Sequence, residues 1–323
     1  MKIQIIYLLL SFIFTAFLGK IIIPILKKLK VGQSEREDGP RSHLRKQGTP
    51  TMGGIMMIIT IIVFTIIACI LNPNEKFIVP ILAVSLASIG FGIIGLIDDF
   101  KKVVLKNTDG LSPKLKMLGL LIISAIYTIF LLKYAGIGTE IIIPFIDYEL
   151  VLPIWLYIPF TIFVMLGATN AVNLTDGVDG LAGSVSAIIL TAIAIIAIKL
   201  NNIAISVFGS ILVGCCAGFL IYNFHKAKVM MGDTGSLLLG GAISSMMIYL
   251  RNPLLIILLA IIPVAETVTV ILQVLYFRKT GKRLFRMSPL HHHFELSGWR
   301  ENKVVGVFSL ITLVACVISI GSI

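Results

Sequence analysis

Five aspartates stand out in this 323-residue sequence because each lies at the end of a long apolar run that carries almost no other charge. Asp98 and Asp99 occur in GLIDDFKK, Asp176 and Asp179 occur in NLTDGVDGLAG, and Asp233 occurs in MGDTGS. A carboxylate beside a bilayer is costly, so such a residue usually faces a cavity, an ion or a polar ligand. Clustered carboxylates with lysines nearby are typical of sites that bind a divalent cation and phosphate groups. The pattern therefore favours an enzyme over a structural scaffold.

Lysines follow the first pair of carboxylates closely. Two adjacent carboxylates such as Asp98 and Asp99 cannot both be ionised comfortably without a cation or a basic partner nearby. Lys102 and Lys116 lie in the stretch that follows. An ammonium group suits phosphate oxygens as a compact point charge. This stretch therefore predicts a basic environment for phosphate groups.

Two further segments carry carboxylates among small polar residues. Asn173, Asp176 and Asp179 repeat every three residues, so they share one helical face if this segment is helical. The segment has no lysine or arginine, so another loop, an ion or a ligand must balance its charge. Residues 232–236, with Asp233 among glycine and hydroxyl side chains, lie at a predicted helix start, where backbone N–H groups bind anions. Any one of these aspartates could instead be a plain helix cap.

A basic loop near the N-terminus, at 27–54, ends in the sequence GTPTMGG. Lys46 leads into this sequence, whose glycines allow the backbone to approach a ligand closely and whose Thr51 offers a hydroxyl. A positively charged cytoplasmic loop with a Pro/Gly helix entry explains most of the charge here. It does not explain the density of small residues at 48–54, for which a ligand site is the alternative interpretation.

The last basic loop holds the sequence PLHHHFE. Its three consecutive histidines, His291, His292 and His293, cannot occupy one helical face, so the i,i+4 pattern of a helical zinc site is absent. The chain has five histidines in all, and three together in a basic loop suggest phosphate or sugar contacts. Glu266 is one further acid within an apolar run, and one interpretation is a structural pairing with these histidines.

Long apolar runs must position these residues. Hydrophobic residues make up 57% of the chain and charged residues 13%, whereas a soluble domain has roughly 25% charged residues. Ten runs approach the roughly 20 residues that a helix needs to cross the hydrocarbon core of a bilayer. They cover about 3–26, 53–71, 77–97, 115–133, 153–170, 181–199, 203–222, 235–250, 253–277 and 304–322. Since most runs lack alternation of polar and apolar residues, a β-barrel is disfavoured. We predict a single all-α, polytopic membrane domain over residues 1–323 with about ten transmembrane helices.

The distribution of basic residues predicts how these helices are oriented. If the N-terminus is non-cytoplasmic, the odd-numbered loops hold 21 of the 27 lysines and arginines and the opposite side holds 5. The positive-inside rule then places both termini outside and the odd-numbered loops in the cytoplasm. All five aspartates fall at that cytoplasmic face, which weakens the interpretation of each as a helix cap. The net charge of +11 mostly reflects this topology, so it does not indicate a nucleic-acid partner.

Taken together, these segments resemble the phospho-N-acetylmuramoyl-pentapeptide-transferase family, the bacterial enzymes that make lipid I. GTPTMGG, DDFKK, NAVNLTDGVDGLAG, MGDTGS and PLHHHFE occur in the order typical of the family, and the resemblance covers essentially the whole chain. The aspartate motifs alone would indicate only the broader polyprenyl-phosphate sugar-1-phosphate transferases. PLHHHFE and GTPTMGG narrow the match to the muramoyl-pentapeptide branch.

The resemblance implies a reaction, a cofactor and a location. Enzymes of this family move phospho-N-acetylmuramoyl-pentapeptide from its UDP carrier onto undecaprenyl phosphate, release UMP and require Mg²⁺. We accordingly expect UDP-N-acetylmuramoyl-pentapeptide and undecaprenyl phosphate as substrates, a bacterial plasma membrane location, and a homodimer. Direct in-line attack of the lipid phosphate on the β-phosphate is favoured, and a two-step path through a phospho-aspartate at Asp233 stays open.

The resemblance also assigns roles to individual residues. Asp98 would be the base that deprotonates the lipid phosphate, with Asp99 beside it, and Asp233 would hold Mg²⁺ on the diphosphate. The residues expected to bind the substrates are Lys46, Thr51, Lys102, Lys116, Asn173, Asp176, Asp179, Asn223, Gly232, Ser236, His291, His292 and His293. One position departs from the family pattern, since Met230 stands where an aromatic residue is common and available to stack on uracil.

Two alternatives to this function have testable signatures. A sister transferase moves N-acetylglucosamine-1-phosphate onto the same lipid. Release of UMP from UDP-N-acetylglucosamine, but not from the muramoyl-pentapeptide nucleotide, would identify it. A cation-coupled transporter would instead carry charges near mid-span within broken helices and inverted repeats. The aspartates of this chain lie at the ends of apolar runs on one side, which favours a transferase.

Overall fold

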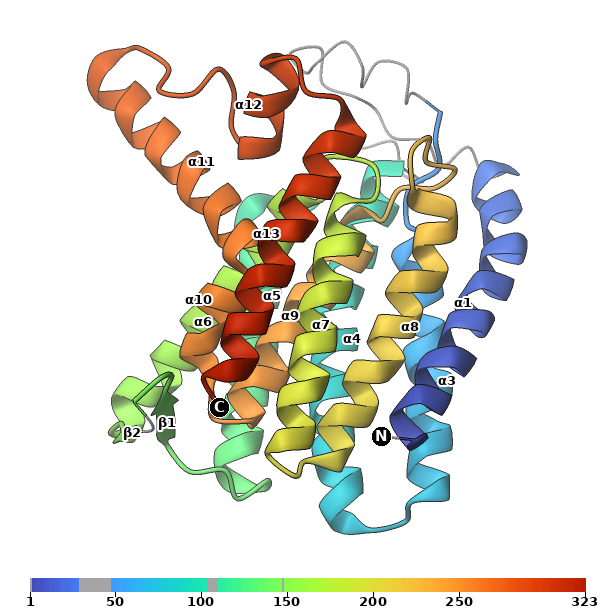
Figure 1. Cartoon of the computed structure of the whole chain (residues 1–323), viewed down its shortest axis with the longest axis vertical. Coiled ribbons are helices and arrows are strands. Elements are labelled where there is room, and N and C mark those ends of the chain that lie inside the picture. Colours follow the sequence, from blue (N-terminus) through green and yellow to red (C-terminus); the bar gives the residue numbers. More distant parts are fainter. Residues whose placement is uncertain (1, 29–47, 104–109, 147) are drawn as a thin grey trace.

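The computed structural model describes residues 2–28, 48–103, 110–146 and 148–323. Within these residues, ten helices of 18 residues or more run back and forth between the two ends of one bundle (Figure 1). They are α1 (Lys2–Lys28), α3 (Gly54–Leu71), α4 (Glu75–Val103), α5 (Pro113–Lys133), α6 (Ile154–Thr175), α7 (Leu181–Lys199), α8 (Ile203–Asn223), α9 (Gly232–Tyr249), α11 (Ile261–Thr280) and α13 (Glu301–Gly321). Each corresponds to one of the ten apolar runs, which confirms the predicted all-α, polytopic membrane fold.

Short elements connect these helices. β1 (Glu140–Ile143) and β2 (Tyr148–Val151) form an antiparallel hairpin between α5 and α6, which the sequence analysis did not predict. η1 (Pro253–Leu255) and α10 (Ile256–Leu259) precede α11, so the ninth apolar run is divided rather than continuous. α12 (Leu290–Leu296) carries the three histidines and lies at the end of the bundle opposite to both termini (Figure 1).

Helix α9 differs from the other nine long helices in its surroundings. Those nine are long and apolar enough to cross a membrane by length and composition, within the part of the chain that the structure describes. α9 is not among them, and its sequence contains Asp233 and several glycines and serines. Every residue from Thr234 to Tyr249 is buried, and the helix packs against α4 and α6. A helix that contacts protein rather than lipid can carry small and polar residues, which favour close helix packing.

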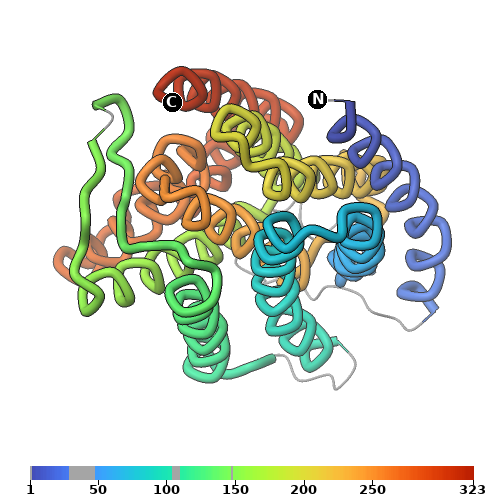
Figure 2. Tube along the Cα trace, turned by 90° about the horizontal axis from the view of Figure 1, so that it is seen from below, coloured from blue at the N-terminus to red at the C-terminus, as the bar shows by residue number. Residues whose placement is uncertain are grey.

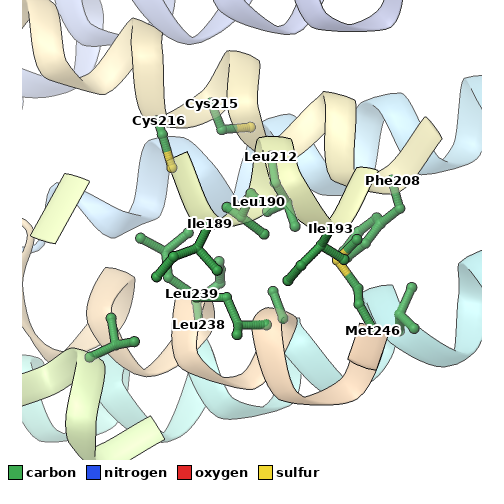
Figure 3. Close-up of a cluster of buried hydrophobic side chains, with 14 of the residues drawn as sticks. Ile189, Leu190, Ile193, Phe208, Leu212, Cys215, Cys216, Leu238, Leu239 and Met246 are labelled. Atoms are coloured by element: carbon green, nitrogen blue, oxygen red, sulfur yellow. The ribbon is translucent and has the colours of Figure 1, made fainter. Parts of the chain in front are cut away.

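Small residues let α9 approach its neighbours closely. A side chain at Gly95 of α4 would overlap the backbone at Asp233, and a side chain at Gly54 of α3 would overlap the backbone at Gly235. Apolar side chains from α7 and α8 pack against another part of α9 (Figure 3). Glycines at the contact allow two backbones to meet directly. The first turn of α9 is therefore fixed beside the last turns of α4.

Both termini lie at one end of the bundle, and the helix ends that carry the aspartates lie at the other (Figure 1). Figure 2 shows the end that carries the termini, seen from below. Ten passes return the chain to the side on which it began, as the sequence-based topology requires. The end of α4, the end of α6 and the start of α9 meet at the end opposite the termini (Figure 1).

Candidate active site

Two carboxylates and two ammonium groups form a cluster where α4, α5 and α9 meet. Lys102 Nζ lies 2.8 Å from Asp98 Oδ2 and 2.9 Å from Asp233 Oδ2. Lys116 Nζ lies 2.8 Å from Asp233 Oδ2 and 3.4 Å from Asp98 Oδ2. Asp98 and Lys102 are one turn apart on α4, while Lys116 and Asp233 lie in the first turns of α5 and α9. We call these four residues the Asp–Lys cluster.

The Asp–Lys cluster is balanced in charge and accessible through its lysines. Asp98 is 2% exposed, whereas the side chains of Asp233, Lys116 and Lys102 are 16%, 19% and 38% exposed. Two ammonium groups between two carboxylates offset the repulsion between the negative charges. Because the lysines are the more exposed members, a phosphate group can approach them from solvent. Lys46, a further lysine expected at the site, lies outside the described residues.

The turn before α5 orients the Asp98 carboxylate. Leu111 N donates a hydrogen bond of 2.7 Å to Asp98 Oδ1. Gly110 has φ +64°, a left-handed conformation that glycine adopts at no steric cost, and a side chain there would crowd Asp98 and Lys102. Oδ1 therefore contacts the backbone while Oδ2 contacts the lysines.

Asp99 lies apart from the Asp–Lys cluster although it follows Asp98 in the sequence. Its Oδ2 accepts from Thr234 Oγ1 at 2.6 Å and from Thr234 N at 2.9 Å, and its Oδ1 accepts from Asp233 N at 3.2 Å. Backbone N–H groups in the first turn of a helix have no partner within their own helix. The buried Asp99 carboxylate therefore caps α9 from a neighbouring helix and fixes the backbone of Asp233. Sequence reasoning did not identify this cap, because nothing local relates the two segments.

Asn173, near the end of α6, orients the second carboxylate of the cluster. Its Nδ2 donates to Asp233 Oδ1 at 2.7 Å and to Ser236 Oγ at 2.9 Å. Ser236 Oγ donates in turn to Gly232 O at 3.0 Å. Asp233 thus has an amide partner on Oδ1 and the two lysines on Oδ2, so helices from three parts of the chain fix its position.

The condition for Asn173, Asp176 and Asp179 to share one helical face is not met. α6 ends at Thr175, and Asp176 occupies its C-cap position. The chain then turns through Gly180, which has φ +78°, before α7 begins. We call this segment the 176–180 turn. Asn173 reaches the Asp–Lys cluster, whereas Asp176 and Asp179 belong to the turn.

The 176–180 turn contacts the loop between α8 and α9. Asp179 Oδ2 accepts a hydrogen bond of 3.0 Å from Ala227 N. Asn223 Oδ1 accepts from Gly180 N at 3.0 Å, and its Nδ2 donates to Val229 O at 2.9 Å. Asn223 is buried and joins the two segments through its amide. Two predicted site residues, Asp179 and Asn223, therefore lie together in the structure.

The GTPTMGG segment pairs with the chain just before α9. Gly53 N donates to the backbone oxygen of Met230 at 2.9 Å, and the Met230 side chain is buried. Gly232 has φ +73°, and a side chain there would lie 2.6 Å from Asp99 Oδ2 and 2.8 Å from Thr51 Oγ1. Only glycine fits such a position without strain. Close backbone contact thus accounts for small residues on both sides, and it places Thr51 next to the cap of α9.

The three histidines of α12 contact different neighbours. Nδ1 of the buried His291 lies 3.0 Å from Oε1 of Glu266, which is buried on α11. His292 Nδ1 lies 2.9 Å from Glu295 Oε2, and His293 Nδ1 accepts from a backbone N–H of the preceding loop at 3.2 Å. The prediction that the three do not share one helical face is confirmed. The expected pairing of Glu266 with one of these histidines is also confirmed.

A second group of possible metal ligands lies beside the 176–180 turn. Within the described ranges, ligand atoms of Asp179, His225 and Glu301 lie within 4.8 Å of one another. An imidazole ligand suits transition metals, whereas Mg²⁺ prefers oxygen ligands. Asp98 and Asp233 offer carboxylate oxygens, so they fit Mg²⁺ better than this group does. The sequence analysis singled out neither His225 nor Glu301, because the three residues are brought together only by folding.

Comparison with known proteins relates this chain to transferases. Residues 81–251, a range that contains the Asp–Lys cluster, match the model of a family described as Glycosyl transferase family 4. The chain is 46% identical over 313 residues to a phospho-N-acetylmuramoyl-pentapeptide-transferase of Clostridium perfringens (strain 13 / Type A), covering 97% of this chain and 96% of the relative. A protein of the same name from Caldanaerobacter subterraneus subsp. tengcongensis is 46% identical over 314 residues, covering 97% and 96%. One from Halalkalibacterium halodurans is 44% identical over 319 residues, covering 99% and 97%.

Proposed function

The chain belongs to the phospho-N-acetylmuramoyl-pentapeptide-transferase family, and we propose accordingly that it transfers phospho-N-acetylmuramoyl-pentapeptide from its UDP carrier to undecaprenyl phosphate. The products are lipid I and UMP, and the reaction serves peptidoglycan synthesis. The protein is a phosphotransferase with multiple apolar helices that place it in a membrane. Similarity over nearly the full length of the relatives supports this function for the whole chain.

The observation that carries the chemistry is the Asp–Lys cluster at one end of the bundle. Both substrates carry phosphate groups, so the reaction must bring like charges together. Lys102 and Lys116 each contact two carboxylates within 3.4 Å, and both are partly exposed. Fixed positive groups of this kind can bind phosphate oxygens and stabilise charge that develops in the transition state. At the end of a membrane bundle, the nucleotide can arrive from water and the lipid phosphate from the bilayer.

The reaction that fits this arrangement is a direct displacement at the β-phosphorus. An oxygen of undecaprenyl phosphate forms the new P–O bond, the bond from the β-phosphorus to the bridging oxygen breaks, and UMP leaves with the electron pair. Asp98 accepts the proton of the lipid phosphate, and the lysines stabilise the charge on the departing UMP. Inversion of configuration at the phosphorus is expected. Net retention would instead indicate a covalent phosphate on Asp233.

Asp233 is the residue that we propose to hold Mg²⁺, with Asp98 beside it. Mg²⁺ is usually bound through one or two carboxylates, and substrate phosphates and waters complete its coordination. Both carboxylates contact lysine ammonium groups in this structure, so Mg²⁺ would take the place of an ammonium group at a carboxylate oxygen. When bound, Mg²⁺ would neutralise part of the charge of the diphosphate and polarise a phosphoryl oxygen.

We propose that the substrates bind around the Asp–Lys cluster, between the 176–180 turn, the GTPTMGG segment and α12. The residues assigned to this pocket are Lys46, Thr51, Lys102, Lys116, Asn173, Asp176, Asp179, Asn223, Gly232, Ser236, His291, His292 and His293. Hydrogen bonds that join Asn173 to Asp233 and Asn223 to the 176–180 turn support a continuous site. Met230, at the position where an aromatic residue is common in the family, is buried.

We propose further that the Asp–Lys cluster faces the cytoplasm, that the protein resides in a bacterial plasma membrane, and that it forms a homodimer. The excess of basic residues in the loops at the cluster end supports the orientation. Labelling of an engineered cysteine at Lys114 with a membrane-impermeant reagent tests it, since intact cells should protect this site. Native mass spectrometry of the detergent-solubilised protein tests the dimer.

A substrate assay tests the proposed function. The purified protein is supplied with undecaprenyl phosphate and either UDP-N-acetylmuramoyl-pentapeptide or UDP-N-acetylglucosamine, with Mg²⁺ or with EDTA. We expect UMP release from the first nucleotide only, and loss of activity in EDTA that Mg²⁺ restores. Asp98→Asn and Asp233→Asn should each abolish turnover, whereas Glu149→Gln on the exposed hairpin should not. UMP release from UDP-N-acetylglucosamine alone would identify the sister transferase, and full activity in either aspartate variant would refute the assigned roles.

A further inference from the structure

Glu266 makes a set of hydrogen bonds that the proposed reaction does not use. This residue lies on α11 and is fully buried. Its Oε2 accepts a hydrogen bond from Leu290 N, and its Oε1 lies 3.2 Å from His291 N and 3.0 Å from His291 Nδ1. One carboxylate therefore caps the start of α12 and also contacts the ring of its first histidine. It ties α11 to the loop that carries the histidine motif.

These contacts select the tautomer of the neutral imidazole ring of His291. Backbone N–H groups can only donate, and both oxygens of Glu266 receive one, so the carboxylate acts as an acceptor. Nδ1 of His291 then carries the hydrogen that points to Glu266, and in the neutral ring Nε2 is left as an acceptor. A glutamate that orients a histidine in this way fixes both the tautomer and the direction of the free nitrogen.

The free nitrogen of His291 faces the 176–180 turn. A side chain at Gly177 would overlap Nε2, so the ring lies directly against the backbone of this turn. Nε2 is buried and has no hydrogen-bond partner among the residues that the structure describes. A buried acceptor without a donor is unfavourable, so such an atom needs an explanation, and a bound ligand is one. This turn is part of the pocket that we assign to the substrates, and we take the nucleotide to be the substrate that binds beside it.

We propose that Glu266 is a positioning residue that directs His291 Nε2 toward the 176–180 turn, and that this nitrogen accepts a hydrogen bond from an N–H or O–H group of the bound nucleotide. The inference rests on the proposed function, since it takes the nucleotide to bind beside this turn. Glu266 itself touches no substrate. Its contribution passes through His291, and loss of either side chain removes the same contact.

Two single variants and their combination test this inference. Glu266→Gln places an amide NH₂ against groups that can only donate and so disturbs the orientation of His291. His291→Asn keeps an N–H near the position of Nδ1 but has no atom at the position of Nε2. In each variant we expect the KM for the UDP substrate to rise about tenfold or more, as loss of one hydrogen bond predicts. The KM for undecaprenyl phosphate should stay within about twofold of the wild-type value, since the lipid does not contact this nitrogen.

The double variant distinguishes a shared contact from two separate defects. Residues that act through one contact are not additive, so Glu266→Gln combined with His291→Asn should be no worse than the more impaired single variant. Additive losses, an equal rise in both KM values, or unchanged KM values with a lowered melting temperature would each indicate a purely structural role and overturn the proposal. Glu149→Gln, the same chemical change on an exposed strand, is the matched control and should leave both KM values unchanged.

Binding of UMP gives a readout that does not depend on turnover. A ligand that binds only the folded state raises the melting temperature of a protein, so UMP should raise the melting temperature of the wild type. We expect Glu266→Gln and His291→Asn to need about tenfold more UMP than wild type for the same rise, and an unchanged UMP requirement would contradict the inference. If the wild type turns over the muramoyl-pentapeptide nucleotide but the variants behave like the control, this inference alone fails. If the wild type neither releases UMP from that nucleotide nor is stabilised by UMP, the proposed function fails as well.

Discussion

Replacing Thr234 by valine removes one hydrogen bond from the Asp99 cap of α9 and keeps the shape of the side chain. The lost bond joins Thr234 Oγ1 to Asp99 Oδ2 over 2.6 Å, and both residues are buried. A hydrogen bond to a charged group contributes about 1.5–3 kcal/mol to stability, so the free energy of unfolding should fall by that amount. The same bond holds the first turn of α9, which carries Asp233. Its loss should therefore also raise the free energy of the transition state by this amount. Since about 1.36 kcal/mol changes a rate tenfold, kcat should fall roughly 10- to 150-fold.

The assay for Thr234→Val combines UMP release with thermal unfolding in detergent. Thr128→Val is the matched control, because Thr128 is buried and lies 3.0 Å from the hydroxyl of Thr161, far from the aspartates in the sequence. The hydrogen-bond partners of Thr128 are neutral, so Thr128→Val should lower the free energy of unfolding by about 0.5–1.5 kcal/mol and leave kcat unchanged. Wild-type kcat in Thr234→Val, at a loss of stability no larger than that of the control, would refute the role of Asp99 as the cap that positions Asp233.

Further predictions concern the packing and the charges at the same end of the bundle. Gly95→Ala should lower the free energy of unfolding by about 1–3 kcal/mol, because the new methyl group overlaps the backbone at Asp233. Gly167→Ala is the control, because its new methyl group has nothing within 4 Å, and it should raise the free energy of unfolding by up to about 1 kcal/mol. Equal melting temperatures for the two variants would contradict the close contact of α4 with α9. Lys116→Met should reduce kcat by about 10²-fold, since one of the two ammonium groups between the aspartates is lost. Lys133→Met, at the other end of α5, should leave kcat unchanged. Similar kcat values for the Lys116 and Lys133 variants would exclude Lys116 from the reaction.

The sequence alone predicted the all-α membrane architecture and the residues of the candidate site. A run of about 20 apolar residues is long enough to cross a membrane as a helix, so the order of the long helices followed without knowledge of tertiary contacts. The number of spans did not, because α9 is not among the nine helices of the described residues that qualify as membrane spans. The distribution of basic residues among the loops predicted the orientation of these helices, and the placement of both termini at one end of the bundle agrees with that orientation. Residue types at the helix ends indicated phosphate chemistry, and the motifs GTPTMGG and PLHHHFE indicated the family. The sequence did not predict the β1–β2 hairpin or the division of the ninth run; in the structure β1 contacts η1 and α10 contacts α13, so both segments meet distant parts of the chain.

Only the tertiary structure decided which partners each aspartate contacts. Asp98 and Asp99 are neighbours in the sequence, yet their side chains leave α4 in different directions, one toward the lysines and the other toward the first turn of α9. Likewise, of the three adjacent histidines, His291 is the one that lies between Glu266 and the 176–180 turn. Consecutive side chains on a helix point about 100° apart, and their partners come from helices far along the chain. Local patterns therefore supply the charged groups, and the packing of the helices sets which of them meet.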